Sequence, residues 1–401
     1  MSVAENVLSE LRLHKQARRP NIGVTHPRVL LVGPALGRGG AENRFRLVAE
    51  HLFNGTADVA VFEGPVDGIL GGRQRVLSLN WRGEWSYPAM ISRLRRHVRR
   101  LRPDVIMGFG FYPNFVAWAA IAGMRTRPSL VLSEINSPWR EYLEVRGSVR
   151  GRLIHELRKF LYPRASLYAA NSEDGIADAV EYYGVNPAHV RRIPNLVDPK
   201  RLRQLAGIDA GTDDKMDNVA SICIVGRLFH RKRVDTLLRA GARLSREREW
   251  RIDVVGDGPD RRKLEDLAQE LGIRARVRFH GWLENPYPVI ARAAVSVLCS
   301  EFEGFPNVVL EAMALGVPVI TSLNTWDARK MVEQGAALGF PVGNDVALSE
   351  QLEILLKQHA LRSRLIEKAN EYIRFHILES GIREYETLFD VAISLHRVGS
   401  V

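Results

Sequence analysis

Two glutamates near residue 300 carry the clearest chemical signal in the sequence. Glu303 and Glu311 are separated by seven residues within the segment SEFEGFPNVVLEAMALGVP. Within this segment, Asn307 is expected to cap a helix that ends at Gly316. Carboxylates bind the hydroxyls of a sugar or ribose, and the first amides of a helix favour phosphate. The alternative, two ordinary surface charges, leaves the Gly-Phe-Pro loop unexplained.

Two cations form a second candidate group. Arg227 and Lys232 follow a predicted strand, Ile222–Gly226, in the sequence GRLFHRK. Cations at the end of a parallel strand stabilise the charge that develops on a diphosphate leaving group when its bond to a sugar breaks. In a chain with 57 Lys and Arg residues, a solvated basic loop is the competing interpretation. We take Arg227 and Lys232, together with Glu303, as candidate catalytic residues.

A glycine-rich turn near the start of the chain is the third candidate. The sequence GPALGRGGAE follows a predicted strand and opens a predicted helix. Its backbone at Gly39 and Gly40 can approach a phosphate at a helix N-terminus. It is not a dinucleotide-binding fingerprint, because Glu42 stands where the third glycine should be. A purely structural tight turn is the alternative.

Short apolar runs alternate with amphipathic helical patterns along the chain, which predicts parallel βαβ sheets. The alternation stops in a polar stretch, AGIDAGTDDKMDN, and then restarts. We expect an α/β protein with two doubly wound, Rossmann-like domains of about 200 residues each. The predicted strands are Val29–Val32, Val59–Phe62, Val105–Phe109, Leu130–Ser133, Leu167–Asn171, Val190–Pro194, Ile222–Gly226, Ile252–Gly256, Val277–His280, Val295–Ser300 and Val317–Ser322.

The composition limits the class of protein. The chain has 401 residues and two cysteines, Cys223 and Cys299, which both lie in apolar, strand-like runs. We expect buried thiols in a reducing compartment, with no disulfide and no metal site. The N-terminus lacks the apolar core of a signal peptide, and no run approaches the roughly 20 apolar residues of a membrane span. These features predict a cytoplasmic protein.

The formal net charge of +11 is concentrated in two helical segments of the first half of the chain. One carries six arginines between Arg93 and Arg102, and the other carries basic residues between Arg146 and Arg164 beside an apolar stripe. A basic amphipathic helix favours an anionic membrane surface, and core packing with a solvated charged face is the alternative. No nucleic-acid partner is expected, because no helix-turn-helix, zinc or aromatic strand motif accompanies the charge.

The order of these motifs resembles the retaining glycosyltransferases of family 4, which have the GT-B fold. The resemblance covers roughly residues 28–390 and is most specific in the second half of the chain. It rests on the glycine-rich turn, on GRL followed by Lys232, on VGDGP, on PNLVD, on His280-Gly281 and on the spacing of Glu303 and Glu311.

The resemblance implies two Rossmann-like domains that face a central cleft, with the last helix crossing back to the first domain. The expected ranges are a leader at 1–27, an acceptor domain at 28–200, a linker at 201–217, a nucleotide-sugar-binding domain at 218–378 and the crossing helix at 379–401.

The resemblance also implies roles for the candidate residues. Arg227 and Lys232 would contact the diphosphate of the donor. Glu311 would hold the ribose hydroxyls, and Glu303 would lie against the transferred sugar. Gly256 and the segment around Trp282 would border the base. The other expected binding residues are Gly39 and Gly40 in the first domain and Phe305, Pro306, Asn307 and Val308 in the second.

The implied reaction moves a hexosyl or N-acetylhexosaminyl group from a UDP- or GDP-sugar to a glycan or lipid-linked acceptor, in cell-surface polysaccharide or glycoconjugate synthesis. It would retain the anomeric configuration and need neither a metal nor another cofactor. A lipid-linked acceptor would place the protein peripherally at the inner membrane. A nucleotide-sugar epimerase is disfavoured, because the two glutamates and the two cations match transferases.

One departure from the family concerns the first domain. Many relatives carry a histidine after the strand that matches Val105–Phe109, where this chain has GFGFYPN. Backbone groups, Tyr112 or Asn114 would then position the sugar, and Tyr112 is equally expected in the core. Glu134 could meet the sugar or acceptor, or cap the next helix. The missing histidine leaves a non-catalytic nucleotide-sugar-binding protein as the alternative function.

Overall fold

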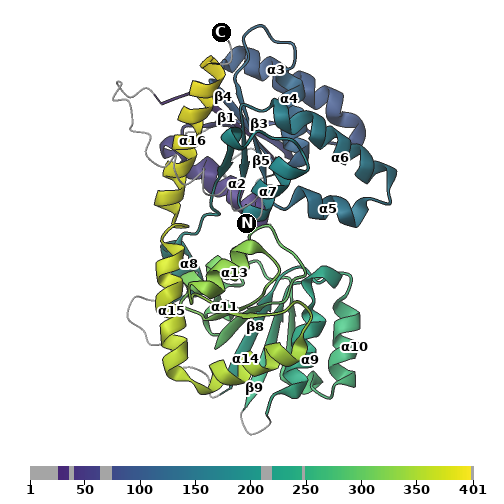
Figure 1. Cartoon of the computed structure of the whole chain (residues 1–401), viewed down its shortest axis with the longest axis vertical. Helices are drawn as coiled ribbons and strands as arrows, with labels where there is room; N and C mark the ends of the chain where they lie inside the picture. Colours follow the sequence, from purple (N-terminus) through teal and green to yellow (C-terminus); the bar gives the residue numbers. More distant parts are fainter. Residues whose placement is uncertain (1–25, 36–39, 64–74, 209–218, 246–248, 399–401) are drawn as a thin grey trace. The chain divides into compact units, whose positions relative to one another are not determined.

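The computed structural model describes residues 26–35, 40–63, 75–208, 219–245 and 249–398, and it divides the chain into two compact domains (Figure 1). The first domain comprises Met1–Asn195 and Gly381–Val401, and the second comprises Leu196–Ser380. In the described ranges, no helix combines the length and the apolar character that crossing a bilayer requires.

The first domain contains a seven-stranded sheet in the order β3-β2-β1-β4-β5-β6-β7, in which every neighbouring pair is parallel. Every residue of β4 and β5 is buried, as expected for central strands with helices on both faces. The strands are β1 Val29–Ala35, β2 Asp58–Glu63, β3 Val76–Ser78, β4 Val105–Phe109, β5 Ser129–Glu134, β6 Leu167–Ala170 and β7 Val190–Arg192. The helices are α2 Gly40–His51, α3 Tyr87–Leu101, α4 Phe111–Ile121, α5 Pro138–Val145, α6 Val149–Leu161, α7 Glu173–Glu181 and α16 Leu378–Val398.

The second domain contains a six-stranded parallel sheet in the order β10-β9-β8-β11-β12-β13. The strands are β8 Ala220–Val225, β9 Trp250–Val255, β10 Val277–Gly281, β11 Val295–Leu298, β12 Val319–Ser322 and β13 Leu338–Phe340. The helices are α8 Pro199–Ala206, α9 Val234–Arg243, α10 Arg261–Glu270, α11 Tyr287–Ala291, α12 Asn307–Ala314, α13 Trp326–Glu333, α14 Asp345–Lys357 and α15 His359–Ile373.

The predicted strands are all present, with small shifts at their ends, so two doubly wound Rossmann-like domains are confirmed. Two further strands, β3 and β13, were not predicted, because they are edge strands of three residues each and too short to show alternation. Both cysteines, Cys223 and Cys299, are buried and free, as expected.

The segment expected as a linker differs from the prediction, because it begins inside a helix. The Asp198 carboxylate accepts hydrogen bonds from the amides of Lys200 and Arg201, both at 3.1 Å, and so caps α8. Gly207, at φ 70°, ends the helix. Much of the remainder of the expected linker, at positions 209–217, lies outside the described residues.

The last helix, α16, packs on the first domain. The Ser129 hydroxyl donates to the carbonyl of Ala392 at 3.1 Å, and Arg44 Nε donates to the hydroxyl of Tyr385 at 2.8 Å. Ser129, Ala392 and Arg44 are buried, and Tyr385 is completely inaccessible to solvent. The α16 helix therefore forms part of the core of this domain, although it is far from the rest in sequence.

In both sheets the strand order reverses beside the first strand, between β1 and β4 and between β8 and β11. Parallel α/β sheets bind ligands beyond the carboxyl ends of the strands at such a switch point. Residues 226–233 follow β8 and residues 299–306 follow β11; we name them the β8 loop and the β11 loop. Arg227, Lys232 and Glu303 therefore lie at the switch point of the second sheet.

Glycines hold the ends of β8, β9 and β10 together. The amide of Gly226 donates to the carbonyl of Val255 at 3.0 Å, and the amide of Gly256 donates to the carbonyl of Gly281 at 2.8 Å. Gly256 has a φ of +128°, and a Cβ at this position would lie 1.9 Å from the carbonyl oxygen of Gly226. Only glycine fits there, because the obstructing atom belongs to the backbone.

We expect Gly256→Ala to lower the free energy of unfolding of the second domain by about 2 kcal/mol or more, through strain at φ and a backbone clash. Gly272→Ala is the matched control, since Gly272 also has a positive φ, +68°, but no atom lies within 4 Å of the added Cβ. The control should cost only about 1 kcal/mol. Thermal unfolding of the two variants measures the difference, and equal losses would contradict the steric argument.

Candidate functional site

The β8 and β11 loops bring three candidate side chains together. Lys232 Nζ forms an ion pair with Glu303 Oε1, and the Ser300 hydroxyl donates to the same carboxylate oxygen at 2.6 Å. The side chains of Lys232 and Glu303 retain 21% and 15% of their accessible surface, so the pair is largely withdrawn from solvent. A small hollow lined by Gly226, Lys232 and Ser300 among other residues lies beside the pair. Sequence reasoning predicted two members of this group and missed Ser300.

The two loops are also joined by contacts that the sequence analysis did not predict. The amide of Glu301 donates to the carbonyl of Arg231 at 2.8 Å. Arg233 has a left-handed backbone, with φ 47°, and its guanidinium bonds Glu301 at 3.3 Å and Asp235 at 3.1 Å. The Arg231 guanidinium lies over the rings of Phe229 and Phe302, at 4.7 and 5.1 Å from their centroids. The β8 loop is therefore held against the β11 loop on both sides of Lys232.

Arg227 is the second predicted cation, and it behaves differently from Lys232. Its side chain is exposed, and its guanidinium forms no hydrogen bond or ion pair with any residue that the structure describes. Its carbonyl accepts a hydrogen bond from the amide of Phe229 at 3.1 Å, which fixes the backbone of the turn. Arg227 is thus an uncompensated positive charge at the end of β8.

The start of α12 corrects one prediction. Pro306 occupies the N-cap position, Asn307 is the first residue of the helix, and no side chain caps it. The proline side chain has no hydrogen-bond acceptor, so Pro306 provides no side-chain cap for the first amides of α12. The predicted end of the helix is confirmed: Gly316 has φ 75°, and the amide of Val317 donates to the carbonyl of Ala312 at 2.9 Å.

Two predicted binding residues of the β11 loop lie in the core. Phe305 retains 5% of its accessible surface, and its ring centroid is 5.0 Å from that of His376. Pro306 is buried as well, while Asn307 and Val308 are partly exposed. The side chains of Phe305 and Pro306 therefore anchor the loop, and only their backbone could contact a ligand.

Glu311 lies one turn inside α12 and is partly buried. The hydroxyl of Tyr287, in α11, donates to Glu311 Oε1 at 3.4 Å. Burial raises the pKa of the Glu311 carboxyl to about 7, and the hydrogen bond from Tyr287 opposes this rise. Among the described residues, no hydrogen bond or ion pair joins Glu311 to Glu303. The two carboxylates thus differ in environment, since Glu303 is paired with a cation and Glu311 is not.

The remaining predicted residues occupy mixed positions. Gly256 belongs to the glycine contacts at the strand ends, and Trp282, just after β10, is 62% exposed and free to contact a ligand. Gly39 lies outside the described residues, and Gly40 is the first residue of α2. Arg44, also in α2, was not predicted: it is 2% exposed, and its two terminal nitrogens have no hydrogen-bond partner among the residues that the structure describes. Its only sequence signal is its position shortly after the glycine-rich turn.

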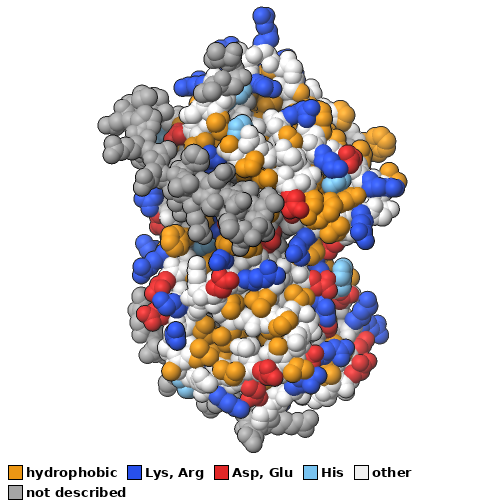
Figure 2. All heavy atoms as spheres, in the orientation of Figure 1, with side chains coloured by type: hydrophobic (Ala, Val, Ile, Leu, Met, Phe, Trp, Pro, Cys, Tyr) orange, Lys and Arg blue, Asp and Glu red, His pale blue; other side chains and the backbone are white. Residues whose placement is uncertain are grey.

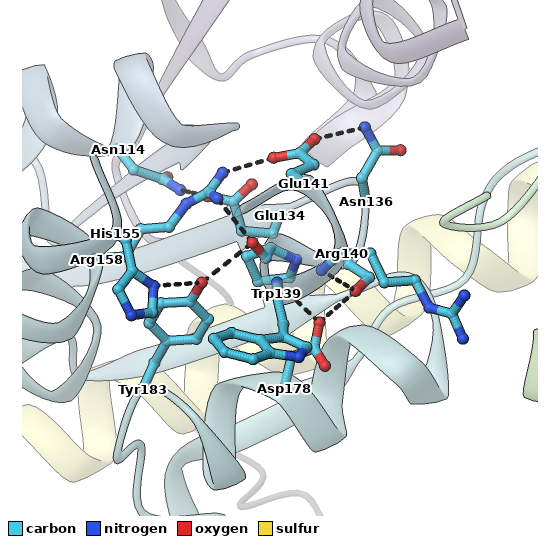
Figure 3. Close-up of polar contacts among 12 residues, drawn as sticks. Asn114, Glu134, Asn136, Trp139, Arg140, Glu141, His155, Arg158, Asp178 and Tyr183 are labelled. Carbon is cyan, nitrogen blue, oxygen red and sulfur yellow. Dashed lines mark hydrogen bonds and ion pairs between the residues drawn. The ribbon is translucent and has the colours of Figure 1, made fainter. Parts of the chain in front are cut away.

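In the first domain, the carboxyl end of β5 leads into a buried polar cluster (Figure 3). The Glu134 carboxylate accepts hydrogen bonds from the hydroxyl of Tyr162 and from Asn114 Nδ2, the latter at 3.3 Å. Glu134 does not cap the next helix, because Ser137 accepts the hydrogen bond from the amide of Arg140. Burial raises the pKa of Glu134 to about 7, against the opposing charge of the nearby Arg158.

The residues after β4, where the family histidine is absent, pack against neighbouring residues of the domain. Asn114 is fully buried and bonds the backbone of Ser133 through both ends of its amide, at 3.1 and 3.3 Å. Gly108 allows this approach, since a Cβ there would lie 2.4 Å from Asn114 Oδ1. Tyr112 stacks on Tyr87 and accepts a hydrogen bond from Arg150 at 2.6 Å. Asn114 is therefore a structural residue, and a role for it in positioning a sugar does not fit its burial.

Arg158 of α6 extends the buried cluster to the neighbouring helix. It donates to the carbonyl of Pro138 at 3.0 Å and to Glu141 at 2.7 Å, so it ties α6 to α5 (Figure 3). Asp178, from α7, accepts hydrogen bonds from the Ser137 hydroxyl and from the amide of Trp139, the latter at 3.1 Å. These contacts fix the start of α5 against α6 and α7.

The two parts of the chain match sequence models of known families. Residues 38–201 match the model described as Glycosyltransferase Family 4, and residues 213–372 match the model described as Glycosyl transferases group 1. The second match includes all of the β8 and β11 loops.

Individual proteins show the same similarity. The chain is 28% identical over 284 residues to the N-acetylgalactosamine-N,N'-diacetylbacillosaminyl-diphospho-undecaprenol 4-alpha-N-acetylgalactosaminyltransferase of Campylobacter jejuni, covering 70% of this chain and 75% of that protein. It is 35% identical over 171 residues to the lipopolysaccharide core biosynthesis glycosyltransferase LpsD of Rhizobium meliloti, covering 42% of this chain and 49% of that protein. The structure of Anabaena Alr3699/HepE in complex with UDP-glucose is similar with a TM-score of 0.73 and 18% identity, covering 94% of this chain and 100% of that one. At that identity, the likeness shows the fold.

The buried carboxyl of Glu134 makes stability depend on pH. Its pKa is about 7 in the folded protein and 4.5 for an unperturbed glutamate, so the folded state binds the proton more tightly. Stability from this group is therefore present below about pH 4.5 and lost as the pH rises toward 7. Glu134→Gln removes the titration and keeps an acceptor for Tyr162. From about pH 5 to pH 8, we expect the unfolding temperature of the unmodified protein to fall relative to this variant.

Glu156→Gln, which removes an exposed carboxylate from α6, is the control for this measurement. Its unfolding temperature should follow that of the unmodified protein across the same pH range. Parallel curves for Glu134→Gln and the unmodified protein would show that Glu134 does not titrate in this range.

Proposed function

The chain belongs to family 4 of the glycosyltransferases, and we propose that it transfers a hexosyl or N-acetylhexosaminyl group from a nucleotide-diphosphate sugar to a lipid-linked or glycan acceptor. The donor would be a UDP- or GDP-sugar, and the product would enter cell-surface polysaccharide or glycoconjugate synthesis. The observation that carries the proposal is the grouping of Lys232, Glu303 and Ser300 at the switch point of the second sheet.

Lys232 and Glu303 have complementary chemistry for such a donor. An ammonium group has three N–H donors, so Lys232 can keep one on Glu303 and direct the others to phosphate oxygens. The Glu303 carboxylate accepts hydrogen bonds only, and two of its partners already fix one of its oxygens. We propose that its other oxygen binds hydroxyls of the transferred sugar, next to the phosphate that Lys232 contacts.

Arg227 and Glu311 complete the proposed donor site. Arg227 is exposed and unpaired among the described residues, so a diphosphate would supply the negative charge that it lacks. Glu311, with its pKa raised to about 7, can either accept or donate a hydrogen bond to ribose hydroxyls near neutral pH. Trp282, which is 62% exposed, is proposed to border the base.

We propose that the reaction retains the anomeric configuration. The acceptor oxygen bonds to the anomeric carbon as the bond from that carbon to the diphosphate breaks, and the acceptor's proton passes to the departing phosphate oxygen. The positive charges of Lys232 and Arg227 would stabilise this leaving group. The similar proteins from Campylobacter jejuni and Rhizobium meliloti, which are named for an undecaprenol-linked substrate and for lipopolysaccharide core synthesis, support a lipid-linked acceptor. Such an acceptor would bring the protein to the cytoplasmic face of a membrane.

Donor turnover by the purified protein, across a panel of nucleotide-sugars and acceptors, tests the function. We expect Lys232→Ala and Glu303→Ala each to lower kcat/KM by at least about a hundred-fold, because each leaves its partner uncompensated at the reacting bond. The double variant should lose little more than either single variant, since the two residues act as one unit. Arg239→Ala, which removes an exposed cation of α9, is the control and should retain full activity.

Each other outcome has a distinct meaning. Tight donor binding without turnover on any acceptor would replace the transferase by a non-catalytic nucleotide-sugar-binding protein. Absence of donor binding would overturn both functions. Additive losses in the double variant would show that Lys232 and Glu303 contribute independently to the reaction.

Because Lys232 and Arg227 supply fixed positive charge, we predict a reaction that needs no divalent cation. Activity measured after treatment with EDTA should equal activity with added Mg²⁺ or Mn²⁺. A loss in EDTA that either metal restores would contradict this prediction, and it would assign part of the diphosphate charge to a metal.

A further inference from the structure

Exposed apolar side chains gather at one place on the first domain. They lie on the short helix η3, Glu84–Ser86, and on the hairpin formed by α5 and α6. Trp85 is 98% exposed, Val149 is 76% exposed and Leu153 is 60% exposed. We name this set the apolar tip: Trp85, Leu143, Val145, Val149 and Leu153. Apolar side chains of this size are seldom exposed together without a binding role.

Specific contacts bring η3 next to the hairpin and hold the tip in place. Arg150, at the start of α6, forms an ion pair with Glu84 at 2.7 Å and donates to the Tyr112 hydroxyl at 2.6 Å. The carbonyl of Val145 lies 2.3 Å from where a Cβ of Gly151 would be, so the two helices are in close contact. The tip is therefore a preformed surface on a rigid support.

Basic residues surround the apolar tip. Residues 140–164 carry seven Lys and Arg against three Glu. Arg146, Arg150 and Arg152 are all exposed. Glu84 and Glu156 each neutralise one cation, Arg150 and Lys159, and the remaining cations of this segment still outnumber its remaining acids. Figure 2 shows hydrophobic and basic side chains side by side where Figure 1 labels α5 and α6.

The tip lies toward the ligand-binding edge of the sheet. The η3 helix follows β3 and the hairpin follows β5, so both are reached from the carboxyl ends of parallel strands. Ligands of parallel α/β sheets bind at this edge. A surface docked there would hold a lipid-linked substrate near the strand ends.

We propose that the apolar tip and its arginines dock on an anionic lipid bilayer, with Trp85, Val149 and Leu153 inserted between headgroups and Arg146 and Arg152 against lipid phosphates. This inference rests on the proposed function, because it assigns the surface that would present a lipid-linked acceptor. Exposed aliphatic side chains, an exposed tryptophan and arginine together match the chemistry of the bilayer interface.

The other basic segment of the domain, α3, does not have this chemistry. Two of its arginines are tied to backbone carbonyls, Arg93 to Ser78 at 3.0 Å and Arg95 to Ala122 at 2.7 Å. Among the described residues, α3 has no large exposed hydrophobic side chain. Of the two basic segments predicted from the sequence, the structure therefore favours the one that contains α6.

Cosedimentation of the full chain with vesicles tests the proposal, using phosphatidylcholine alone and phosphatidylcholine mixed with phosphatidylglycerol. Binding should require the anionic lipid and weaken as salt is raised. Two double variants test the two components of binding. Trp85→Ser with Leu153→Ser removes apolar side chains, and Arg146→Glu with Arg152→Glu reverses the charge. Each should weaken binding by about ten-fold or more, from lost apolar insertion and from reversed charge.

Two controls match these changes elsewhere on the protein. Arg96→Glu with Arg99→Glu makes the same change of charge on exposed residues of α3, and Phe375→Ser removes an exposed aromatic ring from the second domain. Neither should change vesicle binding by more than about two-fold. Equal losses in the Arg146 and α3 variants would reduce the effect to net charge and overturn the docking surface.

Donor turnover on a soluble acceptor separates this proposal from the proposed function. The tip variants should keep that activity, because the tip lies outside the proposed donor site. Normal turnover without vesicle binding would overturn the docking surface alone, and vesicle binding without donor turnover would overturn the function alone. Self-association that the tip variants abolish, without binding to lipid, would assign the tip to a second copy of the chain.

Discussion

The ion pair between Lys232 and Glu303 is the contact on which the candidate site depends. It joins two loops that are 71 residues apart in sequence and that meet only because the strand order places β8 beside β11. The backbone bond from Glu301 to Arg231 and the position of the Arg231 guanidinium over two aromatic rings hold the same loops together. The conformational freedom of Lys232 is thus restricted before a ligand arrives, which is the requirement for an electrostatic site that does not reorganise during the reaction.

The positions of Arg227, Lys232 and Glu303 were predictable because they depend on topology. Apolar runs that alternate with helical patterns specify parallel strands, and polar residues just after such strands must lie at the carboxyl edge. The partners of these residues were not predictable in the same way. Arg233 contacts Glu301 across the two loops, and Phe305 is in the core because it packs against His376, 71 residues away. Ser300 contacts Glu303 within the β11 loop, through a turn that no sequence motif specifies. Local sequence patterns do not specify which residues far apart in the chain will be in contact.

In the first domain, polar residue types at the ends of strands suggest ligand binding, although these residues pack inside the domain. Glu134 ends β5 and Asn114 follows β4, at the carboxyl edge of the sheet, which is where a ligand-binding residue is expected. The structure instead pairs them with each other and with Tyr162, in a cluster that holds the ends of β4 and β5. Because glycine has no side chain, Gly108 leaves room for the buried Asn114. A buried carboxyl at this place is therefore explained by the fold, and it needs no substrate.

The arginines of the first domain show why net charge alone does not identify a partner. Arg158 is buried and joins two helices, and the Arg95 guanidinium is held in place by a backbone carbonyl. Arg146 and Arg152 are exposed next to exposed aliphatic side chains. A uniform positive charge attracts every polyanion, whereas burial of apolar side chains stabilises only a complex whose interior excludes water. The combination of the two on one hairpin therefore supports the proposed lipid surface over nucleic acid, which the count of arginines in the sequence does not do.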